Sequence, residues 1–90
     1  MYNKYDSEDL GDSGAWSYEK DLRGQDFKGA FLIGANLSNC DLCGVNFLGS
    51  DVRKMDIRNS DLSKSLFLTP AQISACVINR YTKLPEYIGY

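Results

Sequence analysis

A large apolar residue recurs at every fifth position between residue 20 and residue 69. Read in units of five, this stretch runs KDLRG, QDFKG, AFLIG, ANLSN, CDLCG, VNFLG, SDVRK, MDIRN, SDLSK and SLFLT. The second place is Asp or Asn in eight of the ten units, and Phe31 and Leu66 are the exceptions. The third place is always apolar, and its occupants are Leu22, Phe27, Leu32, Leu37, Leu42, Phe47, Val52, Ile57, Leu62 and Phe67. Ten consecutive units in one phase identify an internal repeat.

A period of five fits neither an α-helix nor a flat β-strand. In an α-helix, residues five apart are rotated by about 140°, so the apolar series would wander around the cylinder. In a strand, an odd spacing would place successive large residues on opposite faces. We therefore expect the chain to turn a corner in every unit, so that four units close a coil of about twenty residues. Residues twenty apart then stack, and the third places fill the interior in columns such as Phe27, Phe47 and Phe67.

The remaining places of each unit have distinct expected roles. The first place is mostly small, which suits the narrow space inside a corner. The second-place Asp or Asn is expected to bond nearby backbone N–H groups, as these side chains do in turns. The fifth place is often Gly, which tolerates the positive φ that a corner can require. Asn39 and Asn59 share one fifth-place column and are expected to form a ladder.

The repeated units resemble the pentapeptide-repeat family, whose consensus A(D/N)LXX is matched best by Ala35-Asn36-Leu37-Ser38-Asn39. The resemblance covers fifty of the ninety residues. It implies an all-β fold, a right-handed four-sided β-helix of about two and a half coils in this chain. It also implies a bacterial protein, because most members are bacterial. The later SLFLTPAQI…TKLP pattern resembles the C-terminal segment of a subset of this family.

Three regions are expected along the chain: a leader over residues 1–19, the β-helix over 20–69 and a closing segment over 70–90. The leader is polar and acidic, and is expected to be either flexible or an arm that docks on a partner. Its Trp16 and Tyr18 are expected to cover the open top of the coils in preference to forming a partner site. Thr69 and Pro70 predict the start of a short capping helix that ends near Asn79. The tail beyond it, with Leu84, Tyr87, Ile88 and Tyr90, is expected to run along the outside and to cover Leu48, Leu66 and Leu68.

The charge and hydropathy of the chain restrict the cellular location that we expect for it. The net charge is −2, and the leader alone carries five acidic residues against one lysine. Residues 20–69 carry seven basic residues against six Asp, so the predicted β-helix is close to neutral. No apolar run is long enough to span a membrane, and the first residues lack the order of a signal peptide. We therefore expect a cytoplasmic protein that does not act on membranes.

The chain offers little for catalysis or for binding a cofactor. It has no His, no Gly-rich phosphate loop and no nucleophile motif. Cys40 and Cys43 occupy the first and fourth places of one unit, so one is expected to point inward and the other outward. This placement disfavours a disulfide between them, and two thiols alone fall short of the four ligands of a structural zinc. We expect free thiols, no metal, no cofactor and no enzymatic activity.

These features predict a non-catalytic protein–protein interaction or scaffold module. Its partner would be another protein or a second copy in a homodimer, and direct binding of nucleic acid is not expected. The expected contact surface consists of Trp16, Tyr18, Phe31 and Ile33. The resemblance implies one alternative, because some family members mimic a DNA duplex and inhibit or protect type II topoisomerases such as gyrase. That role needs a long acidic rod, whereas Arg53, Lys54 and Arg58 lie among the Asp positions here.

Overall fold

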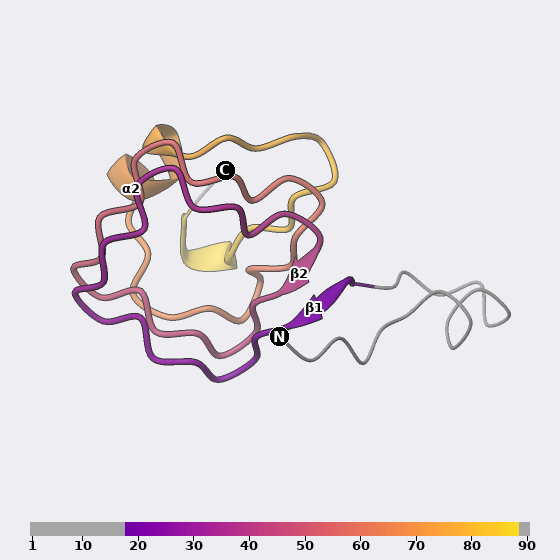
Figure 1. The fold of residues 1–90 in the computed structure, drawn as a ribbon, viewed down its shortest axis with the longest axis horizontal. Helices are drawn as coiled ribbons and strands as arrows, with labels where there is room; N and C mark the ends of the chain where they lie inside the picture. Colours follow the sequence, from indigo (N-terminus) through magenta and orange to yellow (C-terminus); the bar gives the residue numbers. More distant parts are fainter. Residues whose placement is uncertain (1–17, 89–90) are drawn as a thin grey trace, which may run out of the picture.

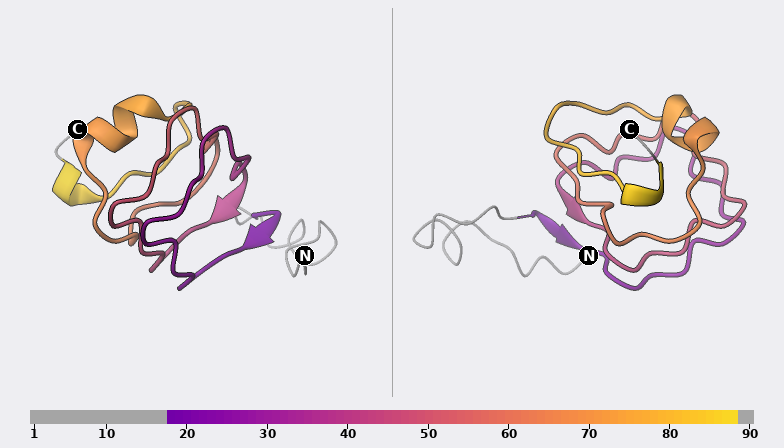
Figure 2. Two further views of the ribbon diagram at one scale, coloured as in Figure 1. Left: turned by 60° about the vertical axis from the view of Figure 1, so that its left-hand side comes forward. Right: turned by 180° about the vertical axis from the view of Figure 1, so that it is seen from behind.

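The computed structural model describes residues 18–88, in which the chain winds repeatedly around a four-sided outline (Figure 1). Its regular elements are β1 (Lys20–Asp21), β2 (Cys40–Asp41), the α-helix α2 (Pro70–Ala75) and the 3₁₀-helix η2 (Glu86–Ile88). β1 and β2 pair in parallel, with Lys20 opposite Cys40. β1 lies at one end of the stacked coils, which we call the upper end, and α2 and η2 lie at the other, the lower end (Figure 2).

Parallel bridges join residues that are twenty apart in the sequence. They connect Asp26 to Asn46, Phe31 to Asp51, Asn36 to Asp56, Asp41 to Asp61 and Asn46 to Leu66. Each bridge is made of short hydrogen bonds, such as the one from Leu37 N–H to the Asp56 carbonyl oxygen at 2.8 Å. The chain therefore returns to the same side of the outline after four units, and each coil is hydrogen-bonded to the next.

The corners are β-turns that close on the third place of each unit. The N–H of Gln25 donates to the carbonyl of Leu22 at 3.2 Å, and equivalent bonds recur along the repeats. The residue before the donor is the fifth place, and it has a positive φ in eight units. Gly24 has φ +75, but Lys54 has φ +58 although it carries a side chain. A positive φ at the third residue of a turn is the feature of type II turns, for which Gly is favoured.

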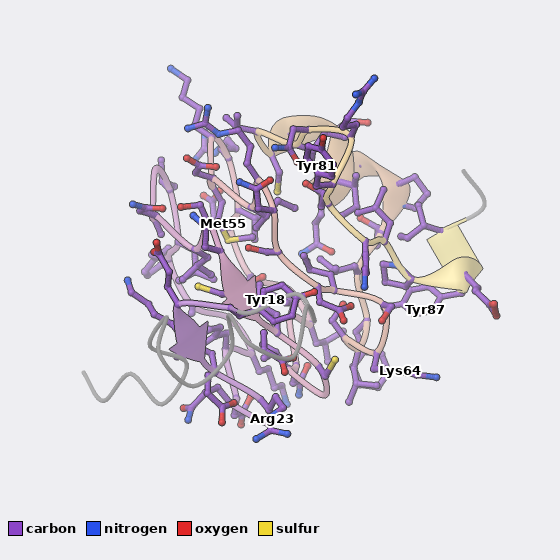
Figure 3. The ribbon with its side chains drawn as sticks, turned by 90° about the vertical axis from the view of Figure 1, so that its right-hand side faces the viewer. Tyr18, Arg23, Met55, Lys64, Tyr81 and Tyr87 are labelled. Atoms are coloured by element: carbon purple, nitrogen blue, oxygen red, sulfur yellow. The ribbon has the colours of Figure 1, made fainter. Side chains whose placement is uncertain are left out.

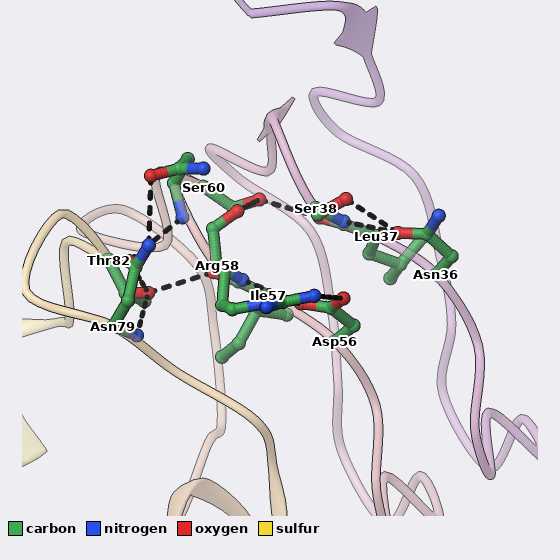
Figure 4. Close-up of polar contacts among 10 residues, drawn as sticks. Asn36, Leu37, Ser38, Asp56, Ile57, Arg58, Ser60, Asn79 and Thr82 are labelled. Carbon is green, nitrogen blue, oxygen red and sulfur yellow. Dashed lines mark hydrogen bonds and ion pairs between the residues drawn. The ribbon is translucent and has the colours of Figure 1, made fainter.

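The second-place side chains brace these corners from outside. Every Asp or Asn at that place accepts a hydrogen bond from the backbone N–H two residues later, at donor–acceptor distances of 2.9–3.3 Å. Figure 4 shows two of them, from Ser38 N–H to Asn36 and from Arg58 N–H to Asp56. The predicted role of these side chains in the turns is confirmed, and it explains why short polar residues occupy the second place.

The interior of the coils is filled from the first and third places. The fully buried side chains include Leu42, Phe47, Ile57 and Leu62 from third places and Val45 and Met55 from first places. Phe27 packs on Phe47 with ring centroids 6.0 Å apart. Leu22, Phe27 and Leu32, in the uppermost coil, pack on this core but are only half-buried. The core is therefore complete in the middle of the stack and thinner toward the upper end.

Phe67 was expected in the core, and this expectation is wrong. Its side chain is 56% exposed and its φ is +64, whereas the next residue, Leu68, is buried. The fifth place of this last unit is Thr69, which is the N-cap of α2 and has extended backbone with φ −113. The positive φ of the unit falls two residues earlier instead, and Leu68 takes the inward position that Phe67 would have held.

The segment after α2 also differs from expectation. The helix ends at Ala75, with Cys76 as its C-cap, although the sequence predicted an end near Asn79. The chain then rejoins the ladder, because Val77 bridges Asp56 and Lys83 bridges Asp61. These residues extend the stack at its lower edge instead of running along its outside, because the free N–H and C=O groups there offer partners for their backbone.

The expected Asn ladder lies one coil lower than predicted. The amide of Asn79 donates to the side-chain oxygen of Asn59 at 2.9 Å, and Asn59 N–H donates to Asn79 at 3.1 Å (Figure 4). Ser60 links the coils nearby, donating to the Leu37 carbonyl at 2.6 Å and accepting from Cys40 N–H at 3.0 Å. Polar side chains inside the corners therefore join coils to one another.

Candidate interaction surface

Phe31 is the most exposed large apolar residue of the described chain, with 88% of its side chain accessible. It occupies a second place, where most units have Asp or Asn, and its backbone bridges Asp51 as the repeat requires. Ile33, two residues later, is 52% exposed. We call these two residues the Phe31 surface. Its exposure follows from the repeat, because second and fourth places point away from the interior.

Tyr18 does not join the Phe31 surface, and it does not lie over the upper end as expected. It is buried against the side of the coils, near Asp41, Cys43 and Asp61 (Figure 3). Burial, and after it the nearby carboxylates of Asp61 and Asp41, raise the pKa of the Tyr18 phenol to about 12. This side is two corners away from the unit that carries Phe31. Trp16 lies outside the described residues.

The upper end exposes an edge of backbone hydrogen-bonding groups. In the uppermost coil, third- and fifth-place N–H groups and first-place carbonyls bond to the coil below. The second-place residues Asp26, Phe31 and Asn36 face the other way, and their backbone N–H and C=O groups have no hydrogen-bond partner among residues 18–88. The lower end differs, because α2, Val77 and Lys83 supply backbone partners there.

Three arginines outside the coils each pair with the aspartate two residues before them, and Arg23 also lies 3.7 Å from Asp41 of the next coil. Arg53 binds Asp51 through two nitrogen–oxygen contacts of 2.9 and 2.7 Å, and Arg58 binds Asp56 at 3.0 and 2.8 Å. Arg23 binds Asp21 in the same way, at 2.8 and 2.9 Å. The hydrogen bond from Arg53 lowers the pKa of Asp51, and that from Arg58 lowers the pKa of Asp56. Each arginine therefore neutralises the carboxylate two residues before it.

The repeats match a family model described as pentapeptide repeats, which finds eight copies over residues 26–63. Residues 26–63 are therefore repeats of the pentapeptide-repeat family. The family implies a right-handed β-helix, which accounts for the twenty-residue ladder, and it suggests a non-catalytic repeat protein. A search of curated proteins found no match to the chain.

The thiols of this pentapeptide-repeat protein are protonated at neutral pH. Burial raises the pKa values of Cys40 and Cys76 to about 11. Burial and then a hydrogen bond with Asp41 raise the pKa of Cys43 to about 12. Cys40 is buried inside its corner, whereas Cys43 is partly accessible from outside. Because the thiolate is the form that attacks and binds metals, these raised pKa values lower the reactivity of all three cysteines.

Residues 18–88 offer neither a metal centre nor a membrane-spanning helix, but they do form a shallow groove. No group of three or more His, Cys, Asp or Glu residues there could hold a metal ion. The helices of this range are all too short to cross a membrane. A shallow open groove of about 360 Å³ lies between α2 and the coil above it, lined by residues such as Val52, Arg53, Ala71 and Ala75. The sequence could not indicate this groove, because it depends on where α2 packs.

Proposed function

We propose that this pentapeptide-repeat protein is a non-catalytic interaction module that binds another protein through the Phe31 surface. The observation that carries the proposal is the 88% exposure of Phe31 at a place where the repeat needs a turn-bracing Asp or Asn. Phe31 gives up that hydrogen bond and leaves an aromatic ring in water. Aromatic residues are the typical anchors of protein–protein interfaces, because they bury a large area with few rotatable bonds.

The scaffold behind this surface is suited to hold it rigidly. We infer a right-handed β-helix of about two and a half coils, whose lower end is capped by α2 and η2. The support is that Leu68, Ile73 and Ile88, all from this end, belong to the buried core. Leu48 and Leu66 are half-exposed on the side next to Phe31, because the described part of the tail, up to Ile88, does not cover them as expected. They extend the apolar area available to a partner.

The DNA-mimic alternative is disfavoured by the ion pairs. A mimic needs carboxylates that are free to reproduce the charge of phosphates, and Asp21, Asp51 and Asp56 are each bound by an arginine of the same unit. The bidentate geometry holds positive charge directly beside each acid. The same pairing gives nucleic acid no continuous basic stripe to bind.

Capture of partners from a lysate of the source cells tests the proposal. The bait is the unaltered chain, Phe31→Asp, or the matched control Phe67→Asp, which alters another exposed phenylalanine. Proteins other than the bait should be captured by the unaltered chain and by the control. Their yield with Phe31→Asp should fall by roughly tenfold or more, because removal of an aromatic hot spot typically costs about 2 kcal/mol or more, and about 1.4 kcal/mol already corresponds to a tenfold loss of affinity. Equal yields from Phe31→Asp and the unaltered chain would refute the proposal.

A further inference from the structure

The hydrogen-bonded ladder is interrupted on the side of the outline that carries Phe31. Nine third-place residues lie between Leu22 and Leu62, and eight of them donate their backbone N–H to a carbonyl of the chain below. Val52 is the exception, because its N–H has no hydrogen-bond partner among residues 18–88. The N–H of Gly49, at the corner just before it, has no partner in this range either. Two neighbouring backbone donors are therefore left over.

The position of α2 explains this interruption. Residue 71 lies twenty positions after Asp51 and would continue the ladder, but it belongs to the helix at the lower end of the stack (Figure 2). Gln72 replaces one of the missing bonds, because its side-chain amide donates to the Ser50 carbonyl at 3.0 Å. The helix therefore satisfies the acceptor of this segment and leaves the donors of Gly49 and Val52 without acceptors.

Both donors belong to residues that line the groove between α2 and the coil above it. Val52 is only 2% exposed, and buried backbone N–H groups are nearly always paired in proteins. Directly above, Gly29 and Leu32 donate to the carbonyls of Leu48 and Asp51, which are three positions apart. By the same pattern, two carbonyl oxygens three residues apart on one extended segment would pair with Gly49 and Val52.

The charges at the rim of the groove favour an acidic occupant. Arg53 lines the groove and is bound to Asp51, with a nitrogen–oxygen distance of 2.7 Å, so these two charges compensate each other. The next residue, Lys54, is exposed and has no ion pair among residues 18–88. Its charge is complementary to a carboxylate of a bound segment, and complementary charges of this kind give specificity.

We propose that the groove binds an extended, acidic segment of a partner protein, whose backbone carbonyls accept from the Gly49 and Val52 N–H groups. Such pairing adds a strand where the ladder lacks one, which is a recurring mode of peptide recognition. The small side chains of Ala71 and Ala75 line the opposite wall and leave room for the segment. The proposal deepens the proposed function and rests on it, because the Phe31–Asp51 bridge places this groove below the Phe31 surface.

A blocked pentapeptide of alternating alanine and aspartate serves as the probe for this site. Titrated into the intact, ¹⁵N-labelled chain, it should shift the Gly49 and Val52 amide signals in a saturable way. Replacing its aspartates by asparagine should weaken binding by roughly two- to fivefold, because exposed ion pairs contribute modestly. Ala71→Leu fills the groove and should abolish the shifts. Ser74→Leu is the matched control, since Ser74 is an exposed residue of α2 that does not line the groove.

Several results would overturn this assignment. They are the absence of a saturable shift at the two amides, an unchanged titration in a folded Ala71→Leu, and equal binding of the asparagine peptide. Amide shifts that grow with protein concentration without peptide would assign the groove to a second copy. Slow hydrogen exchange of the Val52 amide in the dilute free chain would show that this donor is already bound within the chain. Phe31→Asp should leave peptide binding unchanged, so the groove and the proposed function can fail independently.

Discussion

The residue type at the fifth place of each unit is restricted by the backbone conformation more than by any side-chain contact. Five units have Gly there with positive φ, and Asn39, Lys54 and Asn59 adopt positive φ with side chains of their own. Lys64 occupies the same place in its unit, but its backbone does not have a positive φ. Both lysines are exposed, so the two positions differ mainly in conformation.

Replacing each lysine by glycine should therefore change stability in opposite directions. At Lys54, a left-handed conformation costs about 1–2 kcal/mol for a residue with a Cβ, and glycine removes that cost. Glycine also raises the conformational entropy of the unfolded chain, which offsets part of this gain. About 0.5–1 kcal/mol of stabilisation remains. At Lys64 only the entropic loss of about 0.5–1 kcal/mol remains. Urea denaturation measures both variants, and changes of the same sign would contradict this account.

The raised pKa of Cys43 predicts a loss of stability in alkali. Its thiol titrates near 9.0 when the chain is unfolded and at about 12 in the folded protein. Between these values the unfolded chain releases the proton and the folded chain keeps it, so the free energy of unfolding falls as pH rises. Tyr18 acts in the same direction, because its pKa is raised from 10.0 to about 12.

Cys43→Ala removes one of these two titrating side chains, so the free energy of unfolding should fall less steeply as pH rises. The measurement is the free energy of unfolding in urea under reducing conditions, at pH values of about 8 and about 10.5, which lie on either side of the unfolded thiol pKa. Ser38→Ala, at the same place of another unit, should keep the slope of the unaltered chain. An identical slope in Cys43→Ala would show that this thiol titrates normally in the folded state.

Among the elements, the last repeat unit depends on a contact from η2. Its second place is Leu66, so, like the unit with Phe31, it lacks the side-chain oxygen that braces the eight corners with Asp or Asn. The Tyr87 hydroxyl takes over this role, binding Leu68 N–H and the Ser65 carbonyl (Figure 3 shows Tyr87 at the lower end). A residue nineteen positions later thereby supplies the partner that the unit itself cannot provide.

Tyr87→Phe should consequently destabilise the fold by about 1–3 kcal/mol, the usual cost when a hydrogen-bonded partner is removed. Tyr81→Phe is the control, because Tyr81 is similarly exposed and its ring lies beside Arg80 with a separation of 5.9 Å. The control should change stability by less than about 0.5 kcal/mol. Thermal unfolding measures the stability of both variants. Faster amide hydrogen exchange at Leu68 in Tyr87→Phe alone would place the effect at the Leu68 N–H. Equal losses in the two variants would rule out this role for the hydroxyl.

The start of α2 could be read from the sequence, whereas its end could not. Thr69 accepts from Gln72 N–H at 3.1 Å, and Gln72 in turn accepts from Thr69 N–H at 2.9 Å, so the start is encoded within four residues. The helix ends because Val77 enters the ladder, donating to Met55 and accepting from Ile57. No local pattern shows a contact with residues twenty positions away.

On the scale of the whole molecule, the features that the sequence predicts follow from the repeat. The features that it does not predict depend on contacts between distant segments. The phase of the repeat places each third residue inside because every unit repeats the same corner. Phe67 departs from the rule because the next element needs Thr69 as its N-cap. The exposure of Phe31 follows from its place in the unit, whereas the burial of Tyr18 depends on Asp61, forty-three positions later. Local rules therefore predict the coil, and contacts between distant segments decide its ends.

The twenty-residue ladder limits how such a chain can change its length. An insertion of five residues would keep every corner but would move all later residues to the next side of the outline. Asp51 would no longer lie beneath Phe31, and α2 would reach the lower end on a different side. An insertion of twenty residues would restore the pairing of every later unit with the unit below it. Duplication of a whole coil is thus the length change that leaves both ends, and the relation between them, intact.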